Sequence, residues 1–163
     1  MSEINAQLEL KAQVTETFDE DEMPGAVDSA VTYSDFGWKD RLNADSTPTA
    51  EMVHVVEGTG NASLDLTALA RAFGGTLDAT DKKLRMILCN NLSTTTDLTI
   101  ADGGANPYSI NGTNDKVVKP GARYMEFFDD ALADVSGTAK AIDITAGVAE
   151  DWELMMIFGE TPP

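Results

Sequence analysis

Apolar and polar residues alternate along much of this chain, and that alternation is typical of half-buried β-strands. The first clean stretch covers residues 7–15, between Gln7 and Thr15. Its apolar face carries Leu8, Leu10, Ala12 and Val14. The N-terminal segment is therefore predicted to be a two-faced strand, followed by an acidic loop that a Pro24-Gly25 turn closes.

The alternation resumes at short intervals through the rest of the chain. Strands are predicted at residues 30–38, 51–56, 62–66, 84–90, 97–101, 123–128, 141–145 and 152–158. The run from Leu84 to Asn90 is continuously apolar, which favours a central strand buried on both sides. Many short strands about ten residues apart predict an all-β fold, an antiparallel β-sandwich of jelly-roll type.

One segment has helical spacing instead. Leu66, Leu69, Ala70 and Phe73 recur at intervals that suit one helix face. Thr67 is a suitable N-cap, and the glycine pair at residues 74–75 would end the helix. One short helix of about two turns, lying on the sheet, is predicted here.

The length of 163 residues fits one main domain with a short arm. The expected division is an N-terminal strand or arm with its acidic loop at residues 1–25, and a β-sandwich domain at residues 26–163. Leu8, Leu10, Ala12 and Val14 are the expected interface of the arm with a neighbouring subunit.

The charge balance narrows the choice of partners. The chain has 28 acidic and 11 basic residues, a formal net charge of -17. Such a surface repels nucleic-acid phosphates and anionic lipids, so neither is expected as a partner. The acidity fits high solubility, a basic partner surface, or a salty or divalent-rich medium.

Candidate reactive groups are few. Cys89 is the only cysteine and His54 the only histidine, so one chain cannot build a cysteine–histidine or multi-histidine metal site. Both lie in apolar strands and are expected in the core. No nucleophile elbow is present, and an enzyme is not expected. The N-terminus lacks the pattern of a signal peptide and no apolar run reaches membrane-spanning length, so synthesis in a cytoplasm is expected.

Two weaker site hypotheses remain. The oxygen-rich loops at residues 19–22 and at Asp78 with Asp81 could hold a weak structural calcium ion, although the EF-hand spacing is absent. No other cofactor is expected. Aromatic residues could line a sugar platform if they converged on one exposed face, although core packing is commoner for such residues. These aromatic residues are Tyr33, Phe36, Trp38 and Tyr108.

From residue 62 to residue 158 the chain resembles small virion structural proteins of tailed phages, of the head-decoration or minor-structural kind. The similarity is an ordered series of strands and turns, and the N-terminal strand at residues 8–14 also looks like the opening of such proteins. The series comprises residues 63–69, 83–91, 97–101, 106–108, 117–122, 127–129, 142–144 and 153–159. Ala122 departs from the pattern, because a second turn glycine would stand there.

The resemblance implies a protein made in a bacterial cytoplasm and assembled on a phage particle in many copies, often as trimers. Its partner would be the major capsid protein or another virion protein. The expected function is that of a capsid decoration, or cement, protein that binds and stabilises the head shell. The alternatives are a tail or head–tail component, and a jelly-roll module for carbohydrate binding or receptor attachment.

Overall fold

The computed structural model of this chain is all-β, with antiparallel sheets. It describes residues 5–18, 29–43, 51–70, 75–110, 114–128 and 131–160, with side-chain detail from residue 51 onward. The chain divides into two units, Ala6–Arg41 and Leu42–Pro163, the second of which also includes Met1–Asn5. The predicted boundary between residues 25 and 26 lies outside the described residues.

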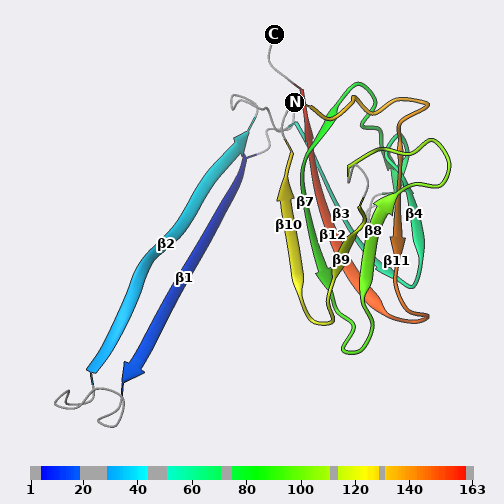
Figure 1. Ribbon diagram of the computed structural model, residues 1–163. Helices are drawn as coiled ribbons and strands as arrows, with labels where there is room; N and C mark the ends of the chain where they lie inside the picture. Colours follow the sequence, from blue (N-terminus) through cyan, green and yellow to red (C-terminus); the bar gives the residue numbers. More distant parts are fainter. Residues whose placement is uncertain are drawn as a thin grey trace. The chain divides into compact units, whose positions relative to one another are not determined.

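The first unit is a two-stranded sheet of β1 (Asn5–Phe18) and β2 (Ser29–Asn43), which run in opposite directions (Figure 1). The two predicted strands at residues 7–15 and 30–38 are confirmed, and each is longer than predicted. Leu8, Leu10, Ala12 and Val14 occupy alternate positions of β1. Their role as an interface stays a prediction.

The second unit, which we call the body, contains two four-stranded antiparallel sheets (Figure 1). The first sheet has the order β10 (Arg123–Phe127), β7 (Lys83–Asn91), β12 (Asp151–Gly159), β3 (Met52–Thr59). The second has the order β4 (Ala62–Asp65), β11 (Ala141–Thr145), β8 (Leu98–Asp102), β9 (Lys116–Val118). A small hairpin pairs β5 (Leu69–Ala70) with β6 (Thr76–Leu77).

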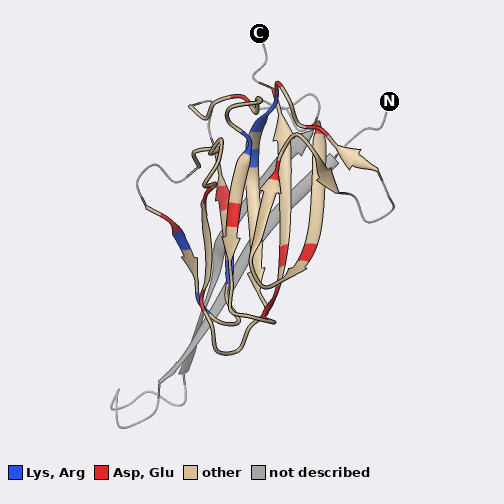
Figure 2. Cartoon of the chain, turned by 90° about the vertical axis from the view of Figure 1, so that its right-hand side faces the viewer, with Lys and Arg blue, Asp and Glu red and all other residues tan. Residues whose placement is uncertain are grey.

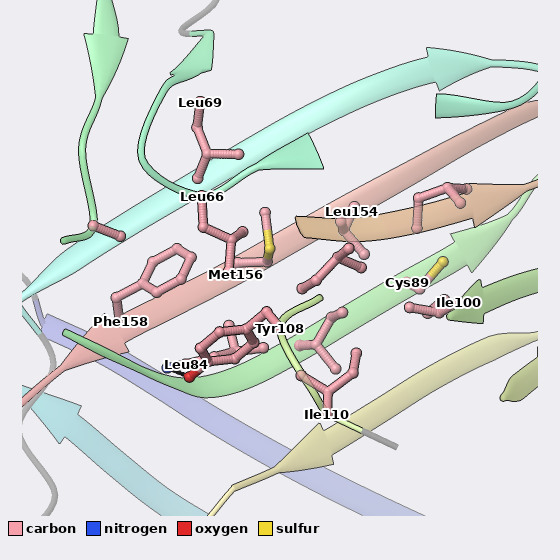
Figure 3. Close-up of a cluster of buried hydrophobic side chains, with 14 of the residues drawn as sticks. Leu66, Leu69, Leu84, Cys89, Ile100, Tyr108, Ile110, Leu154, Met156 and Phe158 are labelled. Atoms are coloured by element: carbon pink, nitrogen blue, oxygen red, sulfur yellow. Dashed lines mark hydrogen bonds between the residues drawn. The ribbon is translucent and has the colours of Figure 1, made fainter. Parts of the chain in front are cut away.

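Both four-stranded sheets contribute to one hydrophobic core (Figure 3). Strand β7 supplies Ile87 and Cys89, and β12 supplies alternate residues from Trp152 to Phe158. From the other sheet come Ile100 of β8 and the apolar residues of β11. Strand β7 lies between β10 and β12 and is buried along most of its length, so the predicted central strand is confirmed.

The predicted short helix is wrong in the part that the structure describes. Residues 66–68 form a turn, and Leu69 pairs with Leu77 across the β5–β6 hairpin. The turn is stabilised by Asp65, whose Oδ1 accepts hydrogen bonds from the Thr67 backbone N–H and hydroxyl. Cap-like residues thus stabilise a turn here, and the spaced leucines enter the core from a turn and a two-residue strand.

Asp65 also forms an ion pair, with 2.6 Å between its Oδ2 and Lys140 Nζ. The hydrogen bond from Lys140, followed by the bond from the Thr67 hydroxyl, lowers the pKa of Asp65 to about 2. A lowered pKa in the folded state contributes stability above the unfolded value of about 4, and that stability is lost as the pH falls towards 2.

We therefore expect Asp65→Asn to flatten the decline in stability between about pH 4 and pH 2. At pH 7 the variant should lose less than about 1 kcal/mol, because the Asp65 side chain is 42% exposed and solvent screens the pair. Urea unfolding across this pH range measures both effects. A variant whose acid slope equals that of the unmodified protein would contradict the assignment.

Candidate interaction surface

The sheet β10-β7-β12-β3 is apolar on its outer side as well as on its core side. Its outward positions alternate with the core residues, and the strand register aligns them in rows. One row runs Val53, Ile157, Met86, Phe127, and the next runs Val55, Met155, Leu88, Met125. We call these eight residues the outer apolar face. None of them belongs to the core cluster shared by the two sheets.

Exposure varies across the outer apolar face. Met86 and Ile157, on the two central strands, are fully buried. At the β3 side, Val53 is 41% exposed and Val55 is 56% exposed. The open part of this face is therefore its β3 margin, where two neighbouring outward positions present apolar side chains to solvent.

An acidic zone follows the apolar rows toward the end of the sheet. The next row along the sheet is Glu57, Glu153, Asn90, Arg123. A hollow of about 270 Å³ opens there, lined by acidic Glu57, Asp151 and Glu153 together with Leu92 and Trp152. This arrangement of carboxylates beside apolar side chains suits a partner surface that carries basic and apolar groups.

Two of the three carboxylates of this zone, those of Asp151 and Glu153, accept hydrogen bonds from side chains of the sheet. Thr59 Oγ1 donates to Asp151 Oδ1 at 2.6 Å, and Asn90 Nδ2 donates to Glu153 Oε2 at 2.7 Å. Among the described residues no three histidine, cysteine or acidic side chains are arranged to hold a metal ion.

His54 lies on β3 opposite Met156, and only 3% of it is exposed. The predicted core position of this histidine is confirmed. Its neighbours Val53 and Val55 point to the opposite side of the strand, as the alternation predicts.

Cys89 is buried in the core, as predicted. Burial raises the pKa of its thiol to about 12, which leaves almost no thiolate at neutral pH. We therefore expect the folded protein to resist iodoacetamide at pH 8, and the protein in 8 M urea to react fully. Mass spectrometry after timed exposure measures the difference, and rapid alkylation of the folded chain would contradict the burial.

Of the two predicted calcium loops, residues 19–22 lie outside the described residues. In the other loop, Asp78 Oδ1 accepts bonds from the backbone N–H of Thr80 at 2.9 Å and from its hydroxyl at 2.5 Å. The side-chain bond, followed by the backbone bond, lowers the pKa of Asp78. Asp81 adopts a positive φ of 64°. These contacts account for a tight turn, and calcium binding stays a hypothesis.

The sugar-platform hypothesis fails at Tyr108. This residue is 1% exposed, and its hydroxyl donates to the Ala133 carbonyl at 2.8 Å and accepts from the Leu84 N–H at 3.1 Å. Because its hydroxyl both donates and accepts a hydrogen bond there, Tyr108 can be buried without an unpaired polar group, and it is absent from any exposed aromatic face. Tyr33, Phe36 and Trp38 lie on β2, where side chains are not described.

Acidic and basic residues both occur along the strands and loops of the body (Figure 2). Each described lysine of the body forms an ion pair. These lysines are Lys82, Lys83, Lys116, Lys119 and Lys140. After all its basic residues are counted, the chain keeps a formal net charge of -17.

Sequence reasoning missed the outer apolar face. A signal for it was present, since residues 84–90 and 152–158 are mostly apolar at both alternating sets of positions, with Arg85, Asn90 and Glu153 as the exceptions. A strand with apolar residues on both faces is expected to be buried on both faces. The register across four strands, which aligns the outward residues into rows, follows only from the fold.

Among the residues that the structure describes, none belongs to a helix with the length and hydropathy needed to cross a membrane. Comparison of the chain with protein-family models, with curated proteins and with solved structures finds no match.

Proposed function

We propose that this chain is a virion structural protein of a tailed phage, a capsid decoration protein that binds and stabilises the head shell. It is made in the bacterial cytoplasm and then assembled on the particle, where the major capsid protein is its partner. Its role is binding and not catalysis, and it acts as an oligomer, with a trimer as the expected form. In an alternative form of this proposal, the chain is a component of the tail or of the head–tail junction.

The observation that carries the proposal is the pairing order of the body strands. The first strand pairs with the last (β3 with β12), the second with the second last (β4 with β11), and the pairs β7–β10 and β8–β9 complete the nesting. Nested antiparallel pairing over two sheets is the winding of an eight-stranded jelly roll, an architecture common in viral capsid domains. This pairing order supports our proposal that the body is a β-sandwich of jelly-roll type.

The surface of the body supports a binding role. The outer apolar face gives a partner an apolar contact, and the acidic zone beside it favours a basic counterpart. The net charge of -17 keeps a protein needed in many copies soluble before it assembles. The same charge disfavours nucleic acid and anionic membranes as partners.

Co-fractionation with particles tests the proposal. Phage particles from the source organism would be banded on a density gradient, and the chain quantified in each fraction by mass spectrometry against the major capsid protein. We expect the chain in the particle band at a fixed ratio that corresponds to a repeated position on the shell. Heads that lack the chain should lose their contents at a lower temperature than decorated heads.

The control is the same gradient loaded with purified chain alone, which should remain at the top. If the chain were absent from the particle band, or present at a ratio that varied between preparations, the virion assignment would be wrong. One to a few copies per particle, found with isolated tails, would select the tail or head–tail variant.

A further inference from the structure

The free edge of β3 is the longest open strand edge in the two sheets of the body. Strand β3 is eight residues long, whereas the other edge strands β10, β4 and β9 have five, four and three residues. An edge strand leaves alternate backbone N–H and C=O groups unpaired within its sheet, so it is a template for another strand.

Strand β3 also lacks the features by which natural proteins protect an edge. Its register with β12 runs from Met52 to Thr59 without a shift, so no bulge twists it away. The strand contains no proline and no lysine, and Glu57 is its only acidic residue. A long, regular and nearly uncharged edge of this kind favours strand addition.

The exposed apolar side chains next to this edge would be stabilised if a further strand buried them. Val53 and Val55 are two of the five large hydrophobic side chains that are exposed in the described part of the chain. A strand laid along β3 would cover part of both valines while it pairs with the backbone. Burial of the two valines and hydrogen bonding to the β3 backbone would therefore stabilise the same contact.

The N-terminal hairpin of β1 and β2 would, for its part, be stabilised by a further strand. Among the described strands, β1 and β2, with 14 and 15 residues, form a two-stranded sheet of their own. A two-stranded hairpin is only marginally stable alone in water, so a hairpin of this length needs a further strand or an apolar face. In the sequence of β1, the apolar residues Leu8, Leu10, Ala12 and Val14 occupy alternate positions.

We propose that the free edge of β3 accepts β1 from the N-terminal hairpin of a second copy of this chain. In the sheets that the structure describes, β3 has one neighbouring strand, β12, and β1 has one, β2. Donation from each copy to the next is a head-to-tail contact, and such contacts form a ring where the rotation between copies closes and a filament where it does not. The pairing holds whether or not the protein is part of a virion.

The first test is the mass of the full-length protein in solution, by size exclusion with light scattering, for two matched variants. Val55→Lys places a charge on the proposed edge, and Val117→Lys places one on the three-residue strand β9. The two valines are 56% and 52% exposed, so the substitutions cost the monomer similar amounts. We expect Val55→Lys to give monomers of 17.4 kDa, and Val117→Lys to keep the oligomer of the unmodified protein.

Circular dichroism of both variants checks that the body remains folded, and hydrogen exchange provides a second readout. The β3 amides that face away from β12 should be protected in the oligomer and exposed in Val55→Lys, while those that pair with β12 stay protected in both. An unmodified protein that is monomeric at the highest concentration reached would overturn the proposal. Equal loss of the oligomer in both variants would also overturn it.

Disulfide trapping then identifies the donor strand. A tagged chain carrying Val55→Cys is mixed with untagged chains that each carry one cysteine in β1, at position 8, 10, 12 or 14. We expect a disulfide between copies for at least one of these positions. A Val55→Cys homodimer alone would show that two β3 edges pair with each other, and a double variant that closes only within one chain would show pairing in cis. Either result overturns the donation between copies.

Discussion

Trp152→Ala should lower the free energy of unfolding by about 3–5 kcal/mol, a large part of the stability of a domain this size. Trp152 is 2% exposed and is among the largest buried side chains of the body. Its indole Nε1–H donates to the Gly60 carbonyl at 2.8 Å, so the ring is fixed in orientation as well as packed. The substitution would leave a cavity at the end of the sheet that the backbone around it cannot fill.

The position of the indole depends on Gly58, its cross-strand partner on β3. A Cβ atom added at Gly58 would lie 2.2 Å from Trp152 Cζ2, well inside van der Waals contact. Gly58→Ala should therefore cost about 1–3 kcal/mol through overpacking. The cost has a specific cause, because the methyl group and the ring compete for the same space.

A double-mutant cycle with Trp152→Leu tests that cause by urea unfolding. In the leucine background the alanine at position 58 has room, so its cost should fall by about 1 kcal/mol or more. Gly137→Ala is the control, because a Cβ there meets nothing within 4 Å, and it should change stability by less than about 0.5 kcal/mol. Additive effects of Gly58→Ala and Trp152→Leu would contradict the steric explanation.

The sequence pattern predicted those elements in which local periodicity and tertiary packing agree. Strand β7 is an example, because its apolar run follows from its place between β10 and β12. The segment from Thr67 shows the opposite case. Its helical spacing is real, but Leu69 gains more by pairing with Leu77 in the core than a two-turn helix would contribute alone.

The candidate surface could be predicted only in part. Alternation placed Val53 and Val55 on the side of β3 opposite His54, and the structure confirms that arrangement. Which strands lie beside β3 depends on pairings between residues far apart in sequence, and local patterns carry no information about them. Tyr108 illustrates the same limit, because its burial depends on hydrogen-bond partners 24 and 25 residues away.

A second large effect is expected at Asn91, which links the two sheets at one end of the body. Asn91 is 2% exposed, and its Nδ2 donates to the carbonyl oxygens of Thr96 and Val118, each at 2.9 Å. Its Oδ1 accepts from the Ser93 N–H at 3.1 Å. One amide therefore satisfies three backbone groups, and Val118 belongs to β9 of the opposite sheet.

Asn91→Asp should destabilise the protein by about 3–5 kcal/mol at pH 7, because it places a buried carboxylate oxygen against two carbonyl oxygens. The introduced carboxyl would have a raised pKa in the folded state, so the folded protein would bind a proton more readily than the unfolded chain. Relative to the unmodified protein, stability should return as the pH falls from 7 towards about 4, and only in part, since a protonated carboxyl donates a single bond.

Asn61→Asp is the matched control. The Oδ1 of Asn61 accepts from the Ala146 N–H at 3.0 Å on an exposed site, and a carboxylate oxygen can accept the same bond. This variant should stay within about 0.5 kcal/mol of the unmodified protein at both pH values. Urea unfolding of both variants at pH 7 and pH 4.5 makes the comparison. If Asn91→Asp were as mild as the control, or equally destabilised at both pH values, then the Asn91 amide would not be the donor that holds Val118 to the end of β7.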